Sequence, residues 1–329
     1  MNIMYKFNSG KNPKWRYYLV NLLRYISLKY FCRIRLNREL KKLFTRKDKE
    51  YIVGRVDYYN KLLPNTFLPL EAQKLAAHKF KKKRTVYFFD TYEFTRWFPQ
   101  SLRWCYCFGD ITEIPLVPSI LKSRPIQGDN ANSVLLNLDK VRHFIFLNDK
   151  IPFSEKINKI IFRGKVVDKP RRIAFMEEYF THPMCDLGDV SKPSKLPSVW
   201  RTEKKTLWDH LRYKFILALE GNDVASNLKW VMSSNSIAVM PKPIYETWFM
   251  EGKLIANYHY IEIKEDYSDL EERLNYYIEH EDEALLIIEH AHEYVEQFKD
   301  KKRERMISLL VLQKYFEQTG QLTINKVKA

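Results

Sequence analysis

Tyr213-Lys-Phe-Ile-Leu-Ala-Leu219 is an apolar run that ends in the turn Glu220-Gly-Asn-Asp223 and leads into the helix-like segment Val224-Ala-Ser-Asn-Leu-Lys-Trp-Val-Met232. A second buried run, Ser236-Ile-Ala-Val-Met240, follows, and a third ends at Ile263. Strand, glycine turn, helix and strand, in this order, make a βαβ unit. Such a unit places a helix N-terminus at the carboxyl edge of a parallel sheet. The stretch therefore predicts a parallel α/β fold with an edge that suits a phosphate-bearing ligand, although many such turns bind nothing.

The alternation of strands and helices extends to both halves of the chain. Apolar runs predict strands at 86–90, 104–108, 143–147 and 159–162, and periodic segments predict helices at 15–50, 68–83, 268–279, 281–298 and 302–318. The polar segment 148–158 is turn-prone and indicates a domain boundary. We therefore expect two α/β domains, 1–150 with a helical N-terminal region and 151–329 with helices at its C-terminal end.

Composition restricts how a phosphate group is bound. The hydrophobic content of 45% is that of a folded protein. Only 9 glycines are present, and neither GxGxxG nor GxxxxGK[ST] occurs, so helix termini and basic side chains must replace a glycine-rich phosphate loop. The cysteines, which are Cys32, Cys105, Cys107 and Cys185, lack zinc-site spacing and are expected to be reduced thiols.

Positive charge is concentrated at the N-terminus. Residues 1–50, from Lys6 to Lys49, contain 14 Lys or Arg against Glu39, Asp48 and Glu50, which accounts for most of the net charge of +16. Such a region suits an anionic membrane surface, nucleic acid or a phosphorylated glycolipid, or it is a solvated Lys-rich face. The run 15–34 is interrupted by four basic residues and falls short of a membrane span, so it is either an interfacial helix or a core-packing one. No signal peptide pattern begins the chain, and a cytosolic location is expected.

A set of residues spread over the second half occurs in a recognisable order: Phe162-Arg-Gly164, Arg171-Arg172, Lys214-Phe215, Gly221, Ala225-Ser226, Lys229, His259-Tyr260 and Asp266-Tyr-Ser-Asp-Leu270. Together they resemble glycosyltransferase family 90, most strongly over 158–300 and more weakly back to about 100. That family includes bacterial lipopolysaccharide glycosyltransferases, fungal capsule xylosyltransferases and animal protein O-glucosyltransferases. The resemblance implies two Rossmann-like domains facing across a cleft (GT-B type) and inverting transfer of one sugar from a nucleotide-sugar donor, by the family's habit a UDP-sugar.

The candidate donor-binding residues lie in the second domain. They are Arg163, Gly164, Arg171, Gly221, Ala225, Ser226, Asn227, Lys229 and Glu246. Arg163 follows a buried strand directly, and Gly164 permits close approach of a ligand. Asn227 stands where the family's animal members have an arginine, so Lys229 or Arg163 would have to supply the positive charge that binds phosphate. The carboxylate of Glu246 suits ribose hydroxyls. Simpler interpretations exist for some of these residues: Arg171 and Arg172 are ordinary surface charge, Ser226 is an N-cap, and Glu246 is a solvent-facing loop residue.

A base for the acceptor hydroxyl is expected at Asp110. This aspartate ends Tyr106-Cys-Phe-Gly-Asp110 and precedes Pro115, which resembles the family's aspartate at a strand end. Asp90, after a similar run, is the competitor, and capping of the next turn is the simpler interpretation of Asp110. No Asp-x-Asp occurs, so a metal clamp on the diphosphate is absent in its simplest form, and we expect no metal or other cofactor.

The leading hypothesis is a bacterial glycosyltransferase at the cytoplasmic face of the inner membrane that adds one sugar to a lipopolysaccharide or related surface glycan. Its partners would be the donor, the glycolipid acceptor and the anionic membrane surface, with no nucleic acid. Two alternatives remain open: a nucleic-acid-binding protein, which would explain the charge but not the residue pattern, and a non-catalytic glycan-binding member of the family, which Asn227 keeps possible.

Overall fold

The computed structural model describes residues 9–80 and 83–323. Lys6 and positions 81–82 of the predicted 68–83 helix lie outside the described residues. The described residues form two compact units: unit 1 comprises 9–12, 142–244 and 251–297, and unit 2 comprises 13–80, 83–141, 245–250 and 298–323. The chain passes from unit 2 to unit 1 between residues 141 and 142. The segment 245–250 and the last helix belong to unit 2, not to the C-terminal unit as expected.

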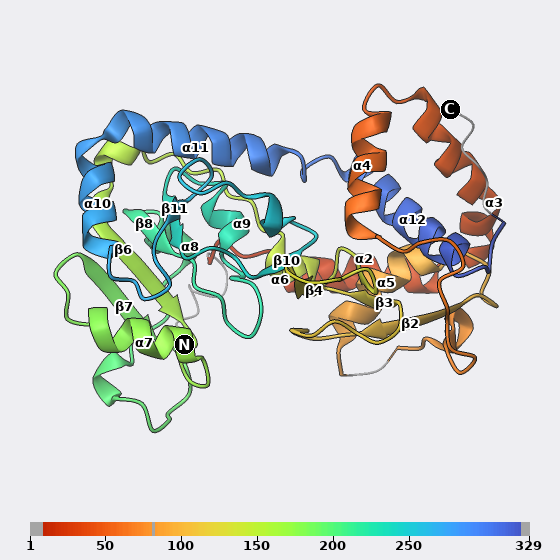
Figure 1. The fold of residues 1–329 in the computed structure, drawn as a ribbon, viewed down its shortest axis with the longest axis horizontal. Helices are drawn as coiled ribbons and strands as arrows, with labels where there is room; N and C mark the ends of the chain where they lie inside the picture. The colour runs from red at the N-terminus through yellow and green to blue at the C-terminus, as the bar shows by residue number, and fades with distance from the viewer. Residues whose placement is uncertain (1–8, 81–82, 324–329) are drawn as a thin grey trace. The chain divides into compact units, whose positions relative to one another are not determined.

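Unit 1 is built on a parallel sheet. In the described part of the chain its five strands follow the order β11-β9-β8-β6-β7, and every neighbouring pair is parallel. The strands and helices are β6 (Ile157–Gly164), α7 (Pro170–Tyr179), β7 (Cys185–Asp189), α8 (Leu207–His210), β8 (Tyr213–Leu217), α9 (Leu228–Val231), β9 (Ile237–Met240), β11 (Ile261–Glu262), α10 (Leu270–Glu279) and α11 (Glu281–Glu296). Figure 1 shows α10 and α11 beside this sheet.

The core of unit 1 explains why these segments form a sheet covered by helices. Alternate residues of the central strands, such as Ile160 and Phe162 on β6, point into one apolar cluster. Helices α7, α10 and α11 close that cluster with residues at helical spacing, among them Phe175, Met176 and Tyr179 of α7. The βαβ prediction at 213–263 is confirmed, although α9 is shorter than the expected segment 224–232.

Unit 2 combines a smaller sheet with helices. Its described elements are α2 (Lys14–Ile26), α3 (Lys29–Lys41), α4 (Lys49–Tyr59), β1 (Gln73–Lys74), α5 (Thr85–Thr95), β2 (Arg103–Cys107), β3 (Ser119–Leu121), β4 (Ser123–Pro125), β5 (Ser133–Leu135), β10 (Tyr245–Thr247) and α12 (Lys301–Gln318), with α6 (Lys140–His143) where the chain passes to unit 1. Strands β2, β3 and β5 are parallel, β1 pairs antiparallel with β2, and β4 pairs antiparallel with β10. Helix α12 packs against α4 and α5 (Figure 1).

The α/β class and the C-terminal helices are confirmed, but three local predictions were wrong. The run 86–90 belongs to helix α5, because Phe88, Phe89 and Tyr92 form one apolar cluster at helical spacing. The run 143–147 is not a strand: the Leu147 N–H donates to Ser233 Oγ at 2.8 Å instead of to a neighbouring strand. The described part of 68–83 consists of turns, strand β1 and a short 3-10 helix.

Candidate functional site

The sheet of unit 1 has a topological switch point at its centre. Strands β6 and β8 are neighbours, and the connection after β6 runs to β7 on one side while the connection after β8 runs to β9 on the other. In open parallel α/β sheets, ligands bind in the crevice outside the carboxyl ends of the strands at such a point. The carboxyl ends here are Gly164 on β6 and Leu217 on β8. Arg163 and Gly164 end β6, and the loop after β8 carries four further predicted donor residues, which are Gly221, Ala225, Ser226 and Asn227.

Arg172 joins the two loops at the switch point. Its guanidinium donates to the Lys165 carbonyl at 2.9 Å and to the Leu219 carbonyl at 2.8 Å. The Arg172 Cζ lies 5.5 Å from the centre of the Phe162 ring. A Cβ added at Gly164 would lie 2.5 Å from that ring, and one added at Gly221 would lie 3.2 Å from Arg172 Nη2. Gly164 is therefore required for the ring to occupy this position, and a side chain at Gly221 would push the guanidinium aside by a few tenths of an ångström.

The positive charge of Arg172 is not balanced by a carboxylate. Burial lowers the pKa of its guanidinium to about 10, so the group remains charged at neutral pH. Within residues 9–80 and 83–323, no acidic side chain forms an ion pair with it, and its buried Nε lacks a hydrogen-bond partner. A desolvated cation without a counter-ion favours binding of an anion, and a guanidinium suits the two oxygens of a phosphate.

Arg171, the predicted donor ligand, is neutralised by acidic side chains. Its guanidinium forms ion pairs with Glu220 at 3.0 Å and with Glu265 at 2.9 Å. Glu220 also accepts a hydrogen bond from the Ile244 N–H at 3.1 Å. The role foreseen for Arg171 therefore fits its neighbour Arg172 better. A signal for this existed in the sequence: Arg172 precedes Phe175, Met176 and Tyr179 by three, four and seven residues, which places it on the buried side of α7.

The loop after β8 is held by side chains that were expected to contact the donor. Asn227 donates through Nδ2 to the Leu217 carbonyl at 2.9 Å, which closes the end of β8. Lys229 is fully buried and pairs with Glu251 at 2.5 Å, so its charge is not available to a ligand. This placement corrects the expectation for Lys229. Of the two small residues, Ala225 is buried and Ser226 is exposed.

Arg163 is held on the opposite face of β6 from Phe162. It donates to the Asp186 carbonyl at 2.7 Å and also forms an ion pair with the Asp186 carboxylate. Burial alone would raise the pKa of Asp186, but hydrogen bonds from Tyr213, Arg163 and Lys205 outweigh it and lower this pKa to about 2. The carboxylate is therefore charged at neutral pH, and Arg163 has a partner within unit 1.

Asp110 lies at the carboxyl edge of the parallel strands of unit 2, as the sequence predicts. It follows the end of β2 by three residues, after Gly109, whose φ of 129° is a conformation that favours glycine. Lys122, directly after β3, is buried and donates to Asp110 Oδ1 at 2.6 Å. Asp110 itself is exposed, so an acceptor hydroxyl can reach its carboxylate, as a general base requires.

Asp90 is not at a strand end, which corrects the basis for its candidacy. It lies within α5, is fully buried, and accepts hydrogen bonds from Tyr17 Oη at 2.8 Å and from the Lys140 N–H at 3.1 Å. Burial raises the pKa of Asp90 to about 6. An acceptor hydroxyl cannot reach a carboxylate that is enclosed in this way.

Glu246 is a core residue of unit 2 rather than a ribose ligand, which corrects the expectation. On β10 it pairs with Arg124 of β4 at 2.8 Å and accepts a hydrogen bond from Tyr58 Oη. The side chains of Glu246 and Arg124 are 2% and 0% exposed. The Arg124 guanidinium also donates to the carbonyls of Tyr58 at 2.8 Å and Ser133 at 2.9 Å, so the pair joins β10 to the rest of the unit.

Replacing Glu246 by Gln is expected to lower the free energy of unfolding by about 3–5 kcal/mol, because it leaves a buried arginine without its counter-ion. Denaturant unfolding measures this change. The double variant Arg124→Met/Glu246→Leu should recover part of the loss, since an apolar pair leaves no uncompensated charge. Nucleotide affinity of the folded fraction should stay unchanged in E246Q. A selective loss of that affinity without loss of stability would restore Glu246 as a ligand.

Two further properties concern the described residues alone. None of the helices described in residues 9–80 and 83–323 has the length and apolar character required to cross a bilayer. In the same residues, His, Cys, Asp and Glu side chains do not gather in any group of three or more that could hold a metal ion.

Comparison with known proteins decides the family. The model of glycosyl transferase family 90 matches residues 135–319. The chain is also similar to the O-glucosyltransferase LpsA of Dichelobacter nodosus, with 42% identity over 265 residues, which cover 80% of this chain and 82% of that protein. The chain belongs to glycosyl transferase family 90. It is a glycosyltransferase, and it therefore acts on a sugar donor and a glycan acceptor.

Family 90 membership agrees with the resemblance inferred from the sequence, and the matched range includes the whole switch point of unit 1. Asp110 lies outside the range that the family model matches. The residue that sequence reasoning passed over is Arg172, which was treated only as the second member of a basic pair.

Proposed function

We propose that the chain transfers one sugar from a nucleotide-sugar donor, with UDP as the carrier, to the glycan of a lipopolysaccharide or related surface glycolipid. The transfer inverts the anomeric carbon and uses no metal ion. Glucose is the first sugar to test, because the D. nodosus relative is named an O-glucosyltransferase. The single observation that carries the proposal is the unbalanced guanidinium of Arg172 at the switch point of a parallel sheet.

The diphosphate of the donor is the anion that fits this position. A nucleoside diphosphate carries phosphate oxygens that accept two parallel N–H bonds from a guanidinium. During transfer the bond between the anomeric carbon and the diphosphate oxygen breaks, and negative charge grows on that oxygen. Arg172 is fixed before the reaction by the Lys165 and Leu219 carbonyls, so it stabilises this charge without reorganisation. Gly221 lets the Arg172 guanidinium lie close to the backbone of the loop after β8.

Asp110 serves as the base in this proposal. Its carboxylate accepts the proton of the acceptor hydroxyl while the hydroxyl oxygen forms a new bond to the anomeric carbon. The nucleoside diphosphate leaves from the opposite side of the sugar, so an α-linked donor gives a β product. The hydrogen bond from Lys122 orients the carboxylate, and the left-handed backbone of Gly109 places Asp110 after β2.

The two units correspond in this proposal to the two Rossmann-like domains of a GT-B enzyme, which face each other across a cleft. The support is that each unit contains parallel strands with a candidate site at their carboxyl edge, Arg172 in unit 1 and Asp110 in unit 2. The absence of Asp-x-Asp and the presence of a preformed cation both favour a metal-independent reaction.

The proposed setting is the cytoplasmic face of the bacterial inner membrane, where the chain is a peripheral protein and meets its glycolipid acceptor. The four free thiols suit a reducing compartment. The basic residues of the first 50 positions suit an anionic lipid surface. Nucleic acid is not a partner in this account.

A panel of nucleotides tests the donor class. UDP and UDP-glucose should each raise the melting temperature of the full chain by several degrees, since a ligand bound only by the native state at 100 times its Kd adds about 2.7 kcal/mol of stability. Addition of EDTA should leave these shifts unchanged. Transfer of glucose from UDP-glucose to lipopolysaccharide that lacks its terminal sugars should follow. A chain that no nucleotide stabilises, or that needs a divalent ion for the shift, would contradict the proposal.

A further inference from the structure

Helix α2 turns its polar side toward the protein. Tyr17 Oη donates to Asp90 at 2.8 Å, and Arg24 pairs with Glu93 at 3.0 Å. Asn21, which comes between Tyr17 and Arg24 in the sequence, is buried. The helix packs on α5 through these residues and the ring of Tyr25. A surface helix of a globular protein normally uses its apolar stripe for this purpose. Among the residues of unit 2 that the structure describes, the apolar side of α2 is therefore left largely exposed.

The apolar stripe of α2 is exposed. Trp15, Leu19, Leu22 and Ile26 recur at helical spacing, and Trp15 and Ile26 are 70% and 68% exposed. The exposed apolar surface continues through the short connection after Ser27 onto α3, with Leu28, Tyr30, Phe31 and Ile34. Contiguous exposed apolar surface of this kind marks a binding site for another molecule.

Basic side chains accompany this surface. Between positions 14 and 41 the chain carries eight Lys or Arg and a single acidic residue, Glu39. Among the exposed ones are Lys14 and Arg16 on α2 and Arg33, Arg35 and Arg38 on α3. Burial, followed by the nearby charges of Arg33 and Arg96, lowers the pKa of Lys29, which reports an excess of positive charge at this surface.

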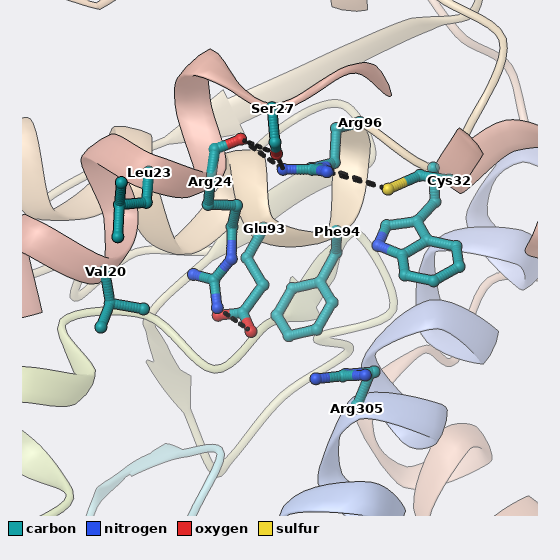
Figure 2. Close-up of a pocket in the computed structure, with 10 residues that line it drawn as sticks. Val20, Leu23, Arg24, Ser27, Cys32, Glu93, Phe94, Arg96 and Arg305 are labelled. Carbon is teal, nitrogen blue, oxygen red and sulfur yellow. Dashed lines mark hydrogen bonds and ion pairs between the residues drawn. The ribbon is translucent and has the colours of Figure 1, made fainter. Parts of the chain in front are cut away.

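A pocket of about 350 Å³ opens beside α2. Val20 and Leu23 of the apolar side line it, together with Phe94 and the guanidinium groups of Arg24, Arg96 and Arg305 (Figure 2). Arg24 is paired with Glu93, and Arg96 donates to Ser27 Oγ at 2.9 Å and to Cys32 Sγ at 3.0 Å. Arg305, on α12, forms no ion pair or hydrogen bond within the part of the chain that the structure describes. The pocket therefore combines an apolar rim with three guanidinium groups and one carboxylate, that of Glu93.

The occupant with matching chemistry is an anionic lipid bilayer. It presents phosphate groups above an acyl layer, and amphipathic helices with basic and aromatic side chains bind in its interfacial plane. We propose that α2 and α3 are the surface by which the chain binds an anionic phospholipid membrane, and that the pocket lined by Arg24, Arg96 and Arg305 receives a lipid phosphate. This inference rests on the proposed function in one respect: a glycolipid acceptor lies in the same membrane plane.

Vesicle binding of the full chain tests the docking surface. The chain should cosediment with vesicles of phosphatidylcholine and phosphatidylglycerol, bind vesicles of phosphatidylcholine alone more weakly, and lose affinity as salt is raised. The variant Leu19→Glu/Leu22→Glu/Ile26→Glu should bind at least about tenfold more weakly, because it places charge on the inserted stripe. Arg305→Gln should reduce the preference for phosphatidylglycerol.

The matched control is Leu285→Glu/Leu286→Glu on α11, where two leucines are exposed to a similar degree on unit 1. This control should bind vesicles as the unmodified chain does. Unchanged vesicle binding by the α2 variant would overturn the proposal. A second result would also overturn it: the unmodified chain does not bind vesicles, sedimentation velocity shows that it is a dimer, and the α2 variant is a monomer.

Nucleotide binding separates the two proposals. The α2 variant should keep the melting shift given by UDP, because its substitutions lie far in sequence from the donor residues and on exposed positions. Loss of vesicle binding with an intact UDP shift supports the docking surface. If the chain binds vesicles but UDP does not raise its melting temperature, the docking surface is supported and the proposed donor is rejected.

Discussion

The variant Asp110→Asn is expected to have a kcat about 10²–10⁴-fold lower than the unmodified chain, because the amide cannot accept the proton of the acceptor hydroxyl. The side chain keeps its shape, and Lys122 still has an oxygen to which it donates. Donor affinity should therefore remain within about twofold, since Asp110 is assigned to the acceptor and not to the diphosphate. Initial-rate kinetics at saturating donor, together with the UDP melting shift, measure both quantities.

The control for this variant is Asp129→Asn, which changes an exposed aspartate of the same unit. It should keep full activity. Retention of activity by Asp110→Asn, at the level of Asp129→Asn, would place the base elsewhere. Asp90 would not become the replacement, because its carboxylate is enclosed by Tyr17 and Lys140.

Replacing Arg172 by Met is expected to lower kcat/KM for the donor by about 10²–10³-fold, because it removes one preorganised positive charge that stabilises the leaving group. Both the affinity for UDP and kcat should fall, since the guanidinium contacts the diphosphate before and during bond cleavage. The variant Arg172→Lys keeps the charge but lacks the two-pronged donor geometry, so it should recover only part of the activity.

Arg171 supplies the matched control, because it is the adjacent residue on the same helix and carries the same group. Its charge is already balanced by Glu220 and Glu265, so Arg171→Met should change kcat/KM by less than about threefold. An equal loss in both variants, or a larger loss in Arg171→Met, would contradict the assignment of the diphosphate to Arg172. Melting temperatures of the two variants show whether either effect arises from loss of folding.

The elements that the sequence predicts well are those whose burial is uniform. The runs at 213–219 and 236–240 are apolar apart from Lys214 and Ser236, because both faces of a central parallel strand are covered. Helices α10, α11 and α12 also follow from periodicity and from acidic residues in their first turns. The run 86–90 is different: its aromatic residues suit a strand by local preference, but in the structure they lie on helix α5, where Phe88, Phe89 and Tyr92 form a cluster that packs against Tyr17 of α2.

The candidate site could be predicted only in part, because a local stretch of sequence does not show which distant residues will form ion pairs. Asp110, Gly164 and Gly221 follow strand ends, and the structure places them there. Lys229 and Glu246 have the right residue types for a donor site, yet Glu251 and Arg124 bind them inside the protein. The difference between Arg171 and Arg172 depends on Glu220 and Glu265, which lie 49 residues or more along the chain.

The measurement that bears most directly on the central claim is a crystal structure of the chain with UDP bound in the absence of added metal. We expect the diphosphate to lie at the carboxyl ends of β6 and β8, with its oxygens within hydrogen-bond distance of the Arg172 guanidinium and against the backbone of Gly221. A diphosphate bound elsewhere, or held there by a divalent ion while Arg172 contacts only the Lys165 and Leu219 carbonyls, would contradict it.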